Sequence, residues 1–250
     1  PSHAFDGICQ QLAKQKPTLK SLAWATKGFD PAAHQLLSDV AQGYFPGAEL
    51  AVISGPTFAK EVAQGLPTAI TVASNSETQA TRLAEALRSN SMRPYISHDL
   101  IGVQVGGACK NVMAIAAGIS DGLGFGANAR AAVITRGLHE ISRLGLAMGG
   151  QMETFMGLAG LGDLTLTCTD NQSRNRRMGL ALAQGSSVAE AKTQIGQEVE
   201  GVNTAREVRA LAAHYHVDMP ITEQTYQVLY QGLSPQAAVE NLLARQTRTE

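Results

Sequence analysis

The stretch Arg93-Pro-Tyr-Ile-Ser-His-Asp-Leu-Ile-Gly-Val-Gln-Val-Gly-Gly-Ala-Cys-Lys-Asn-Val-Met-Ala-Ile-Ala-Ala-Gly-Ile119 divides this chain into two kinds of sequence. Its first five residues are typical of a β-strand, whereas residues 104–119 have the small and apolar side chains of a buried helix. Pro94 lacks a backbone donor, so we expect the strand to lie at a sheet edge. The sequence therefore predicts a structural boundary near Asp99.

Before this boundary, short β-rich segments alternate with helical ones. The predicted strands span 21–26, 49–53, 68–73 and 93–97, and the predicted helices span 4–15, 32–41, 57–63 and 77–89. This alternation indicates an α/β sheet with crossover helices, although the strand directions stay open.

After the boundary, almost every segment has helical spacing. Helices are predicted at 104–119, 128–147, 174–184, 187–195, 200–214, 220–230 and 234–244. We therefore expect an α/β domain over residues 1–99 and an all-α domain over residues 100–250. No long flexible linker separates them, so we expect close packing with a cleft between the two domains.

Composition limits the classes of partner. Lysine plus arginine number 20 against 21 acidic residues, so no global field favours nucleic acid or an anionic membrane. No uninterrupted apolar stretch of transmembrane length and no signal sequence are apparent. The three cysteines, Cys9, Cys109 and Cys168, have no metal-ligand spacing and suit a reducing compartment. We expect a cytoplasmic protein with no metal site, no nucleic-acid partner and no integral membrane segment.

Lys110 is the candidate catalytic residue because it is a lone cation among small and apolar neighbours. Burial disfavours a charged amine and would lower its pKa from roughly 10.4 towards the range of proton transfer. Gly106 and Gly107 allow a ligand or another backbone to approach closely. The alternative is a lysine at a helix end with its amine in water. Asn111 beside it favours a polar site.

Two glycine-bearing turns follow predicted strands. They are Thr26-Lys27-Gly28 and Ser54-Gly55-Pro56-Thr57. Ligands bind at the carboxyl ends of strands in open α/β sheets, and the amine of Lys27 suits a phosphate. Each segment is also explained as an ordinary solvent-exposed turn.

The segment from Gly160 to Asn175 contains a candidate carboxylate, Asp163, and a candidate anion-binding site at Ser173-Arg174-Asn175. Gly160 and Gly162 allow a tight turn before Asp163, which would hold the amine of Lys110 in place if the two side chains meet. Ser173-Arg174-Asn175 then opens a helix, where free amides and a guanidinium suit a phosphate. The alternative is a solvated helix start.

Taken together, these motifs resemble those of the soluble, NAD(P)-dependent type of bacterial glycerol-3-phosphate dehydrogenase, and the resemblance covers essentially the whole chain. The matching motifs occur in one order: Trp24-Ala-Thr-Lys-Gly28, Ile53-Ser-Gly-Pro-Thr-Phe-Ala-Lys-Glu61, Gly106-Gly-Ala-Cys-Lys-Asn111, Gly160-Leu-Gly-Asp163, Thr167-Cys-Thr-Asp-Asn-Gln-Ser-Arg-Asn-Arg-Arg177 and Val199-Glu-Gly201.

The resemblance implies an oxidoreductase that interconverts sn-glycerol 3-phosphate and dihydroxyacetone phosphate with NAD or NADP, NADP being favoured. It also implies a Rossmann-type domain followed by a helical substrate domain, a role in glycerophospholipid synthesis, and a homodimer.

The same resemblance assigns the site residues. Lys110 is the implied proton donor and acceptor. The implied substrate contacts are Lys27, Gly55, Thr57, Lys110, Asn111, Asp163, Thr167, Ser173, Arg174 and Asn175. The implied cofactor contacts are Lys27, Pro56, Arg174, Glu198 and Glu200.

One departure from the family concerns the beginning of the chain. Family members begin with a strand and a glycine-rich turn that holds the dinucleotide pyrophosphate, and no G-x-G-x-x-G motif occurs in the first strand-helix unit here. We therefore expect an incomplete Rossmann-type domain, which alone binds NAD(P)H poorly and is inactive. A related dehydrogenase for another phosphorylated or acidic hydroxy substrate, and a non-catalytic phosphate-binding module, are the alternatives.

Overall fold

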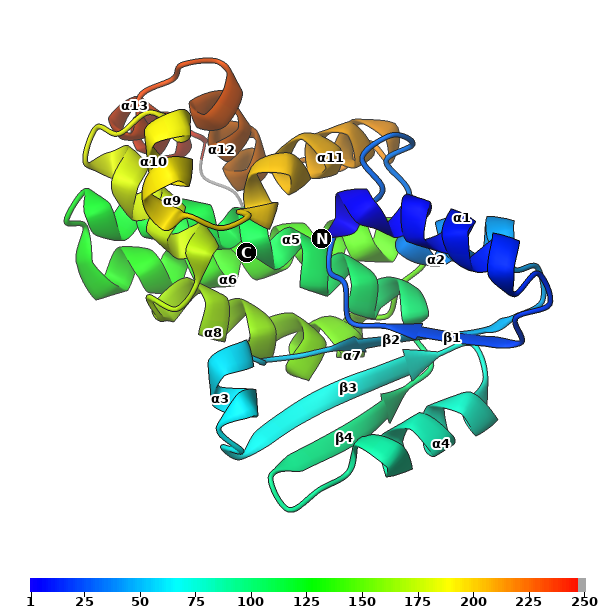
Figure 1. Cartoon of the computed structure of the whole chain (residues 1–250). Helices are drawn as coiled ribbons and strands as arrows, with labels where there is room; N and C mark the ends of the chain where they lie inside the picture. The colour runs from blue at the N-terminus through cyan, green and yellow to red at the C-terminus, as the bar shows by residue number, and fades with distance from the viewer. Residues whose placement is uncertain (247–250) are drawn as a thin grey trace.

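A computed structural model describes residues 1–246 and contains a four-stranded mixed sheet (Figure 1). The strands are β1 (Ser21–Trp24), β2 (Glu49–Ser54), β3 (Thr68–Ser74) and β4 (Met92–Ser97). They lie side by side in chain order. β1 is parallel to β2, β2 is antiparallel to β3, and β3 is parallel to β4. β4 is an edge strand, as its proline predicted.

Short helices accompany this sheet. They are the 3-10 helix η1 (Ser2–Ala4) and the α-helices α1 (Phe5–Gln15), α2 (Leu37–Tyr44), α3 (Ala59–Ala63) and α4 (Glu77–Leu87). α4 covers one face of the sheet, and the long helix α5 (Leu100–Gly122) lies on the opposite face (Figure 1). Phe5, Trp24, Leu37, Leu50 and Val52 belong to the apolar core on this second side.

The predicted helix at 32–41 begins too early. Residues 30–35 form a turn in which the backbone nitrogen of Ala33 donates to Asp30 Oδ2 over 2.7 Å. The backbone nitrogen of His34 also donates to the carbonyl of Asp30 over 2.9 Å. An aspartate side chain that accepts local backbone hydrogen bonds stabilises a turn instead of a helix. α2 therefore begins only at Leu37.

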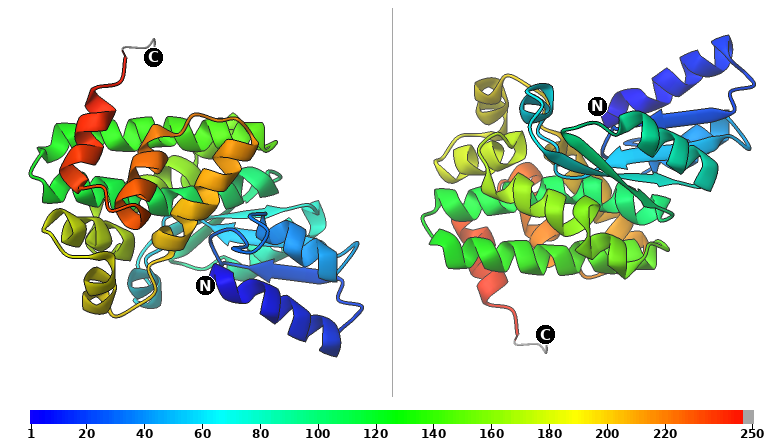
Figure 2. Two further views of the ribbon diagram at one scale, coloured as in Figure 1. Left: turned by 90° about the horizontal axis from the view of Figure 1, so that it is seen from above. Right: turned by 90° about the horizontal axis from the view of Figure 1, so that it is seen from below.

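The remaining elements are helical. After α5 come α6 (Gly126–Ala147), α7 (Met152–Met156), the π-helix η2 (Leu158–Gly162), α8 (Asp163–Thr169), α9 (Arg174–Ala183), α10 (Val188–Ile195), α11 (Glu200–His214), α12 (Pro220–Tyr230) and α13 (Pro235–Leu243). Figure 2 shows α5 between the sheet and the other helices. α7, η2 and α8 were not predicted, because Gly157, Gly160 and Gly162 interrupt the helical pattern.

α5 is the central helix of the molecule. Asp99 caps it by accepting a hydrogen bond from the backbone nitrogen of Gly102 over 2.7 Å. α5 is long and apolar enough to cross a membrane, contrary to the prediction that no apolar stretch reaches this length. However, 83% of its most apolar 18-residue stretch is buried inside the protein. This burial is typical of a core helix.

α5 and α9 contact each other through their backbones. A Cβ atom added to Gly118 would clash with the carbonyl oxygen of Arg176, and one added to Gly179 would clash with the carbonyl oxygen of Ile115. Glycine at both positions therefore permits an approach that larger residues would prevent. This packing holds the beginning of α9 close to the middle of α5, where Lys110 lies.

Candidate active site

A cavity of about 650 Å³ opens at the carboxyl ends of β1 and β2. Because these strands are parallel neighbours, the turns that follow both of them reach the same place, as predicted. α5, α8, α9 and the beginning of α11 supply the rest of the wall. The predicted site residues that line it are Lys27, Thr57, Lys110, Asn111, Thr167, Ser173, Arg174, Asn175 and Glu200.

Lys110 lies in the middle of α5 and is only 7% exposed. Its Nζ atom donates a short hydrogen bond to Asp163 Oδ1, at the beginning of α8. It also donates to Thr167 Oγ1 over 2.9 Å. The structure thus joins two residues that are far apart in the sequence, and the alternative of a solvated lysine at a helix end is wrong.

Lys27 binds the other oxygen of the same carboxylate. Its Nζ atom lies 2.6 Å from Asp163 Oδ2 and donates to the carbonyl oxygen of Gly55 over 3.1 Å. Gly55 has a φ of 126°, which a residue with a side chain rarely adopts, and this conformation is part of the turn that presents the carbonyl. Asp163 is 1% exposed, so one buried carboxylate pairs with two ammonium groups.

Burial and charge act in opposite directions on Lys110. Loss of hydration is the largest effect and lowers the pKa of its amine, the nearby charge of Lys27 also lowers it, and Asp163 raises it, so that the pKa lies at about 8. Lys110 is therefore mostly protonated at neutral pH but releases its proton near pH 8. This is the property that a proton donor and acceptor needs.

The beginning of α9 is built from three consecutive polar residues. Ser173 Oγ accepts a hydrogen bond from the backbone nitrogen of Arg176 over 3.2 Å and caps the helix. Arg174 is exposed and lines the cavity. Its guanidinium is therefore placed to meet an anion that enters from solvent.

Asn175 joins three helices. Its Nδ2 atom donates to Asn111 Oδ1 over 2.9 Å, and its Oδ1 atom accepts from the backbone nitrogen of Gly201 over 2.8 Å. One N–H of the side-chain amide is left for a ligand, since an amide nitrogen carries two protons. Asn175 and Asn111 consequently support the wall as well as facing the cavity.

Four of the predicted residues do not line the cavity directly. Gly55 and Asp163 act through their contacts with Lys27 and Lys110. Pro56 lies in the same turn as Gly55, outside the lining set. Glu198 is exposed and is not brought to the cavity, whereas Glu200 is. Burial raises the pKa of Glu200, whose Oε2 accepts a hydrogen bond from Ser2 over 3.4 Å.

Several lining residues were not predicted from the sequence, and Lys60 is the most informative of them. Lys60 lies in α3, directly after the Gly55-Pro56-Thr57 turn, so its position along the chain was the available signal. With Lys27, Lys110 and Arg174 it gives the cavity four cationic side chains. This charge suits a phosphorylated ligand. No group of three metal-ligating side chains occurs among the described residues.

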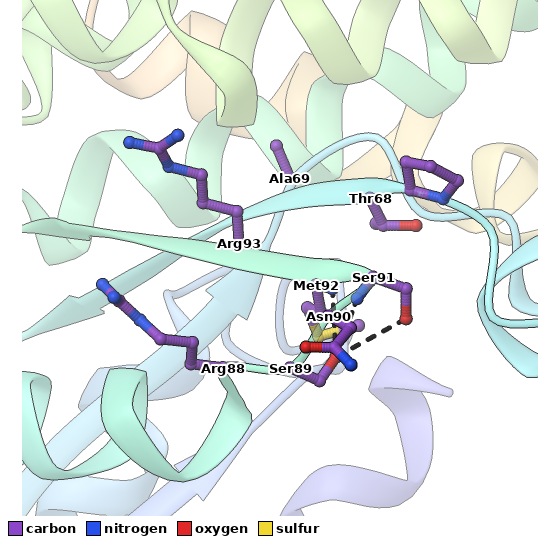
Figure 3. Close-up of a pocket in the computed structure, with 9 residues that line it drawn as sticks. Thr68, Ala69, Arg88, Ser89, Asn90, Ser91, Met92 and Arg93 are labelled. Carbon is purple, nitrogen blue, oxygen red and sulfur yellow. Dashed lines mark hydrogen bonds between the residues drawn. The ribbon is translucent and has the colours of Figure 1, made fainter.

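A second hollow of about 650 Å³ lies at the amino ends of β3 and β4. It is lined by residues 67–69 and 88–93. Figure 3 shows Arg88 and Arg93 extending to one side, away from Asn90 and Ser91. Within it, Ser89 Oγ accepts hydrogen bonds from the backbone nitrogens of Ser91 and Met92 over 3.3 and 3.0 Å. It contains no buried ionisable group.

The sequence matches two family models along most of its length. Residues 1–80 match the NAD-dependent glycerol-3-phosphate dehydrogenase N-terminus, and residues 99–240 match the corresponding C-terminus. The chain belongs to this family. The Rossmann-type sheet followed by a helical domain is thereby confirmed.

Individual relatives agree with the family models. Glycerol-3-phosphate dehydrogenase [NAD(P)+] from Nitrosococcus oceani is 57% identical over 100% of this chain and 73% of its own length. The protein of the same name from Shewanella amazonensis is 56% identical over 100% of this chain and 74% of its own length. A crystal structure of glycerol-3-phosphate dehydrogenase from Coxiella burnetii has a TM-score of 0.95 and 48% identity, covering 98% of this chain and 75% of that one.

Proposed function

We propose that this chain interconverts sn-glycerol 3-phosphate and dihydroxyacetone phosphate with NAD or NADP, and that the reaction supplies glycerophospholipid synthesis. The observation that carries the proposal is the group formed by the buried residues Lys110 and Asp163 with the partly exposed Lys27, beside a cationic cavity in a member of this dehydrogenase family. NADP is the cofactor that we favour.

The cavity fits the nicotinamide end of such a cofactor. It lies at the carboxyl ends of two parallel strands, and its volume falls within the range of roughly 300–1,000 Å³ that is typical of ligand sites. We propose that Lys27, Pro56, Arg174 and Glu200 hold it, and that Glu198, which is exposed outside the cavity, does not. When bound, the nicotinamide supplies the hydride that joins or leaves carbon 2 of the substrate.

Lys110 moves the proton in this scheme. In the reductive direction its ammonium stabilises the negative charge that develops on the substrate oxygen, and it then gives that oxygen a proton. In the oxidative direction the neutral amine accepts the proton. Asp163 and Thr167 fix the Nζ atom in position for both steps.

The phosphate is bound away from the reacting carbon. We propose that Arg174 and Asn175 bind it, and that Ser173, Lys27, Asn111 and Thr57 complete the substrate contacts, while Gly55 acts through its hydrogen bond with Lys27. Binding energy from a remote phosphate orients the reacting carbon towards Lys110. This role suits the exposed guanidinium of Arg174, at the cavity rim.

We also propose that the substrate domain spans residues 100–250 and the dinucleotide-binding part residues 1–99. A cytoplasmic location is supported by the three cysteines, Cys9, Cys109 and Cys168, which are all free and buried. The proposed assembly is a homodimer.

A substrate panel tests the proposed function. In a protein that also includes the glycine-rich strand-turn unit with which family members begin, NAD(P)H should be oxidised when dihydroxyacetone phosphate is added, and kcat/KM for dihydroxyacetone should be at least about 100-fold lower because the phosphate contacts are absent. All the variants described below are made in that protein. A higher kcat/KM for another phosphorylated ketone, or for a 2-oxo acid, would contradict the proposal and indicate a related dehydrogenase.

A further inference from the structure

Arg176 is a buried arginine that does not line the active-site cavity. Its side chain is 9% exposed, although it lies only two residues after Arg174. Its three nitrogen groups bind three different parts of the chain. Nε donates to the carbonyl oxygen of Cys168 over 3.1 Å, Nη1 donates a short hydrogen bond to Asn171 Oδ1, and Nη2 donates to Asp121 Oδ2 over 2.5 Å.

These contacts close the loop that leads into α9. Cys168 lies near the end of α8, and Asn171 lies in the turn between α8 and α9. Arg176 directly follows the segment 168–175, which carries Ser173, Arg174 and Asn175, and its guanidinium binds the beginning of that segment at Cys168 and its middle at Asn171. We call this segment the phosphate turn.

The phosphate turn is also fixed to the core helices. Asp121 belongs to the last turn of α5, and both of its oxygens accept hydrogen bonds from Nη1 of Arg130 in α6, over 3.0 Å each. Asp121 thus connects the guanidinium groups of Arg130 and Arg176. Backbone contact between α5 and α9 at Gly118 adds a second restraint.

We infer that Arg176, held by Asp121 and Arg130, is a positioning residue that sets the phosphate turn for phosphate binding. The inference rests on the proposed function. A planar guanidinium donates in several fixed directions at once, which the single ammonium group of a lysine does not reproduce. A displacement of about 1 Å in a substrate-positioning group can cost up to about 100-fold in rate. The fork geometry of Arg176 is therefore what the turn requires.

The test is Arg176→Lys, which keeps the positive charge and removes the planar guanidinium with its several fixed donors. We expect the ratio of kcat/KM for dihydroxyacetone phosphate to kcat/KM for dihydroxyacetone to fall by at least about 10-fold, mainly through a higher KM for the phosphorylated substrate. Both values come from one preparation, so their ratio does not depend on the fraction of folded enzyme. Arg177→Lys, in the next position of the same helix, is the matched control and should leave the ratio unchanged.

A double-mutant cycle with Arg174→Ala identifies the cause. If Arg176 acts by positioning Arg174, adding Arg176→Lys to Arg174→Ala should cause less than about a 2-fold further change in the ratio. A wild-type ratio in Arg176→Lys, or fully additive losses, would overturn the positioning role. A wild-type ratio in Arg174→Ala alone would instead remove Arg174 from phosphate recognition and count against the proposed function.

Discussion

Two hollows of the same volume, about 650 Å³, differ in the side chains that line them. The cavity at the carboxyl ends of β1 and β2 contains the amine of Lys110, which is bound to the buried carboxylate of Asp163. The hollow at the amino ends of β3 and β4 has the exposed residues Arg88 and Arg93 and the serines Ser89 and Ser91, on an edge strand and its preceding turn (Figure 3). Volume alone therefore does not identify the active site.

The two regions differ in whether their charged side chains are buried, because burying a charged group costs free energy. An ammonium group and a carboxylate lose hydration when they are buried, and their retention requires compensating contacts. The contacts around Asp163 come from β1, α5 and α8, which are distant in sequence and converge only in the fold. Arg88 and Arg93 remain in water and need no such partners.

The largest expected effect concerns Lys110. Lys110→Met keeps the apolar stem and removes the amine, so turnover should fall at least about 100-fold because proton transfer and charge stabilisation are both lost. Arg93→Ala in the second hollow is the comparison and should keep wild-type turnover. Near-normal steady-state turnover of Lys110→Met would contradict a catalytic role for Lys110 and leave no functional difference between the two hollows.

The next effect concerns phosphate recognition. Arg174→Ala should cost roughly 2–4 kcal/mol in transition-state binding for the phosphorylated substrate, because a charge-assisted contact is lost. The loss should shrink when the substrate lacks its phosphate. Arg88→Ala, which removes an exposed guanidinium from the second hollow, should leave kcat/KM unchanged. Equal losses for both substrates would indicate that Arg174 has a structural role.

The dependence of the reaction rates on pH tests the charges around Lys110. The rate of reduction should fall as the pH rises through about 8, where Lys110 loses its proton, and the rate of oxidation should rise there. Lys27→Met removes a cation that lowers the pKa of Lys110, so the inflection should move to higher pH. Asp163→Asn removes an anion that raises this pKa, so the inflection should move to lower pH. Inflections that stay in place in both variants would refute this electrostatic coupling.

The smallest expected effect lies in the second hollow. Ser89→Ala removes an acceptor for two backbone nitrogens in an exposed turn, so the free energy of unfolding should fall by less than about 1 kcal/mol. Turnover should stay within about 2-fold of wild type, since this region contains no group of the proposed mechanism. A larger loss of turnover with normal stability would give the second hollow a function.

The α/β-to-helical order could be predicted from sequence because alternation and helical spacing are local patterns. α11 and α12 begin and end where the sequence places them. The start of α2 was wrong because Asp30 binds its own turn, and η2 was missed because a glycine-rich segment conceals a helix. Local patterns do not record such side-chain and packing effects.

At the active site, too, local sequence patterns could not predict the contacts between distant residues. Lys110 and Asp163 were each recognisable, yet their contact depends on how α5 and α8 pack. Lys60 was missed because a short helix carries it to the cavity, and the burial of Arg176 follows from its partner Asp121 on another helix. Residue types suggest chemistry, but tertiary contacts decide which residues cooperate.

Chemical rescue tests the central claim most directly. Lys110→Ala removes the amine and leaves a space beside Asp163 and Thr167. We predict that reduction of dihydroxyacetone phosphate by this variant is almost abolished and that added methylammonium or ethylammonium restores it in proportion to its concentration, because the exogenous cation replaces the missing proton donor. Arg93→Ala should not respond to either amine. Wild-type activity of Lys110→Ala without added amine would contradict the account.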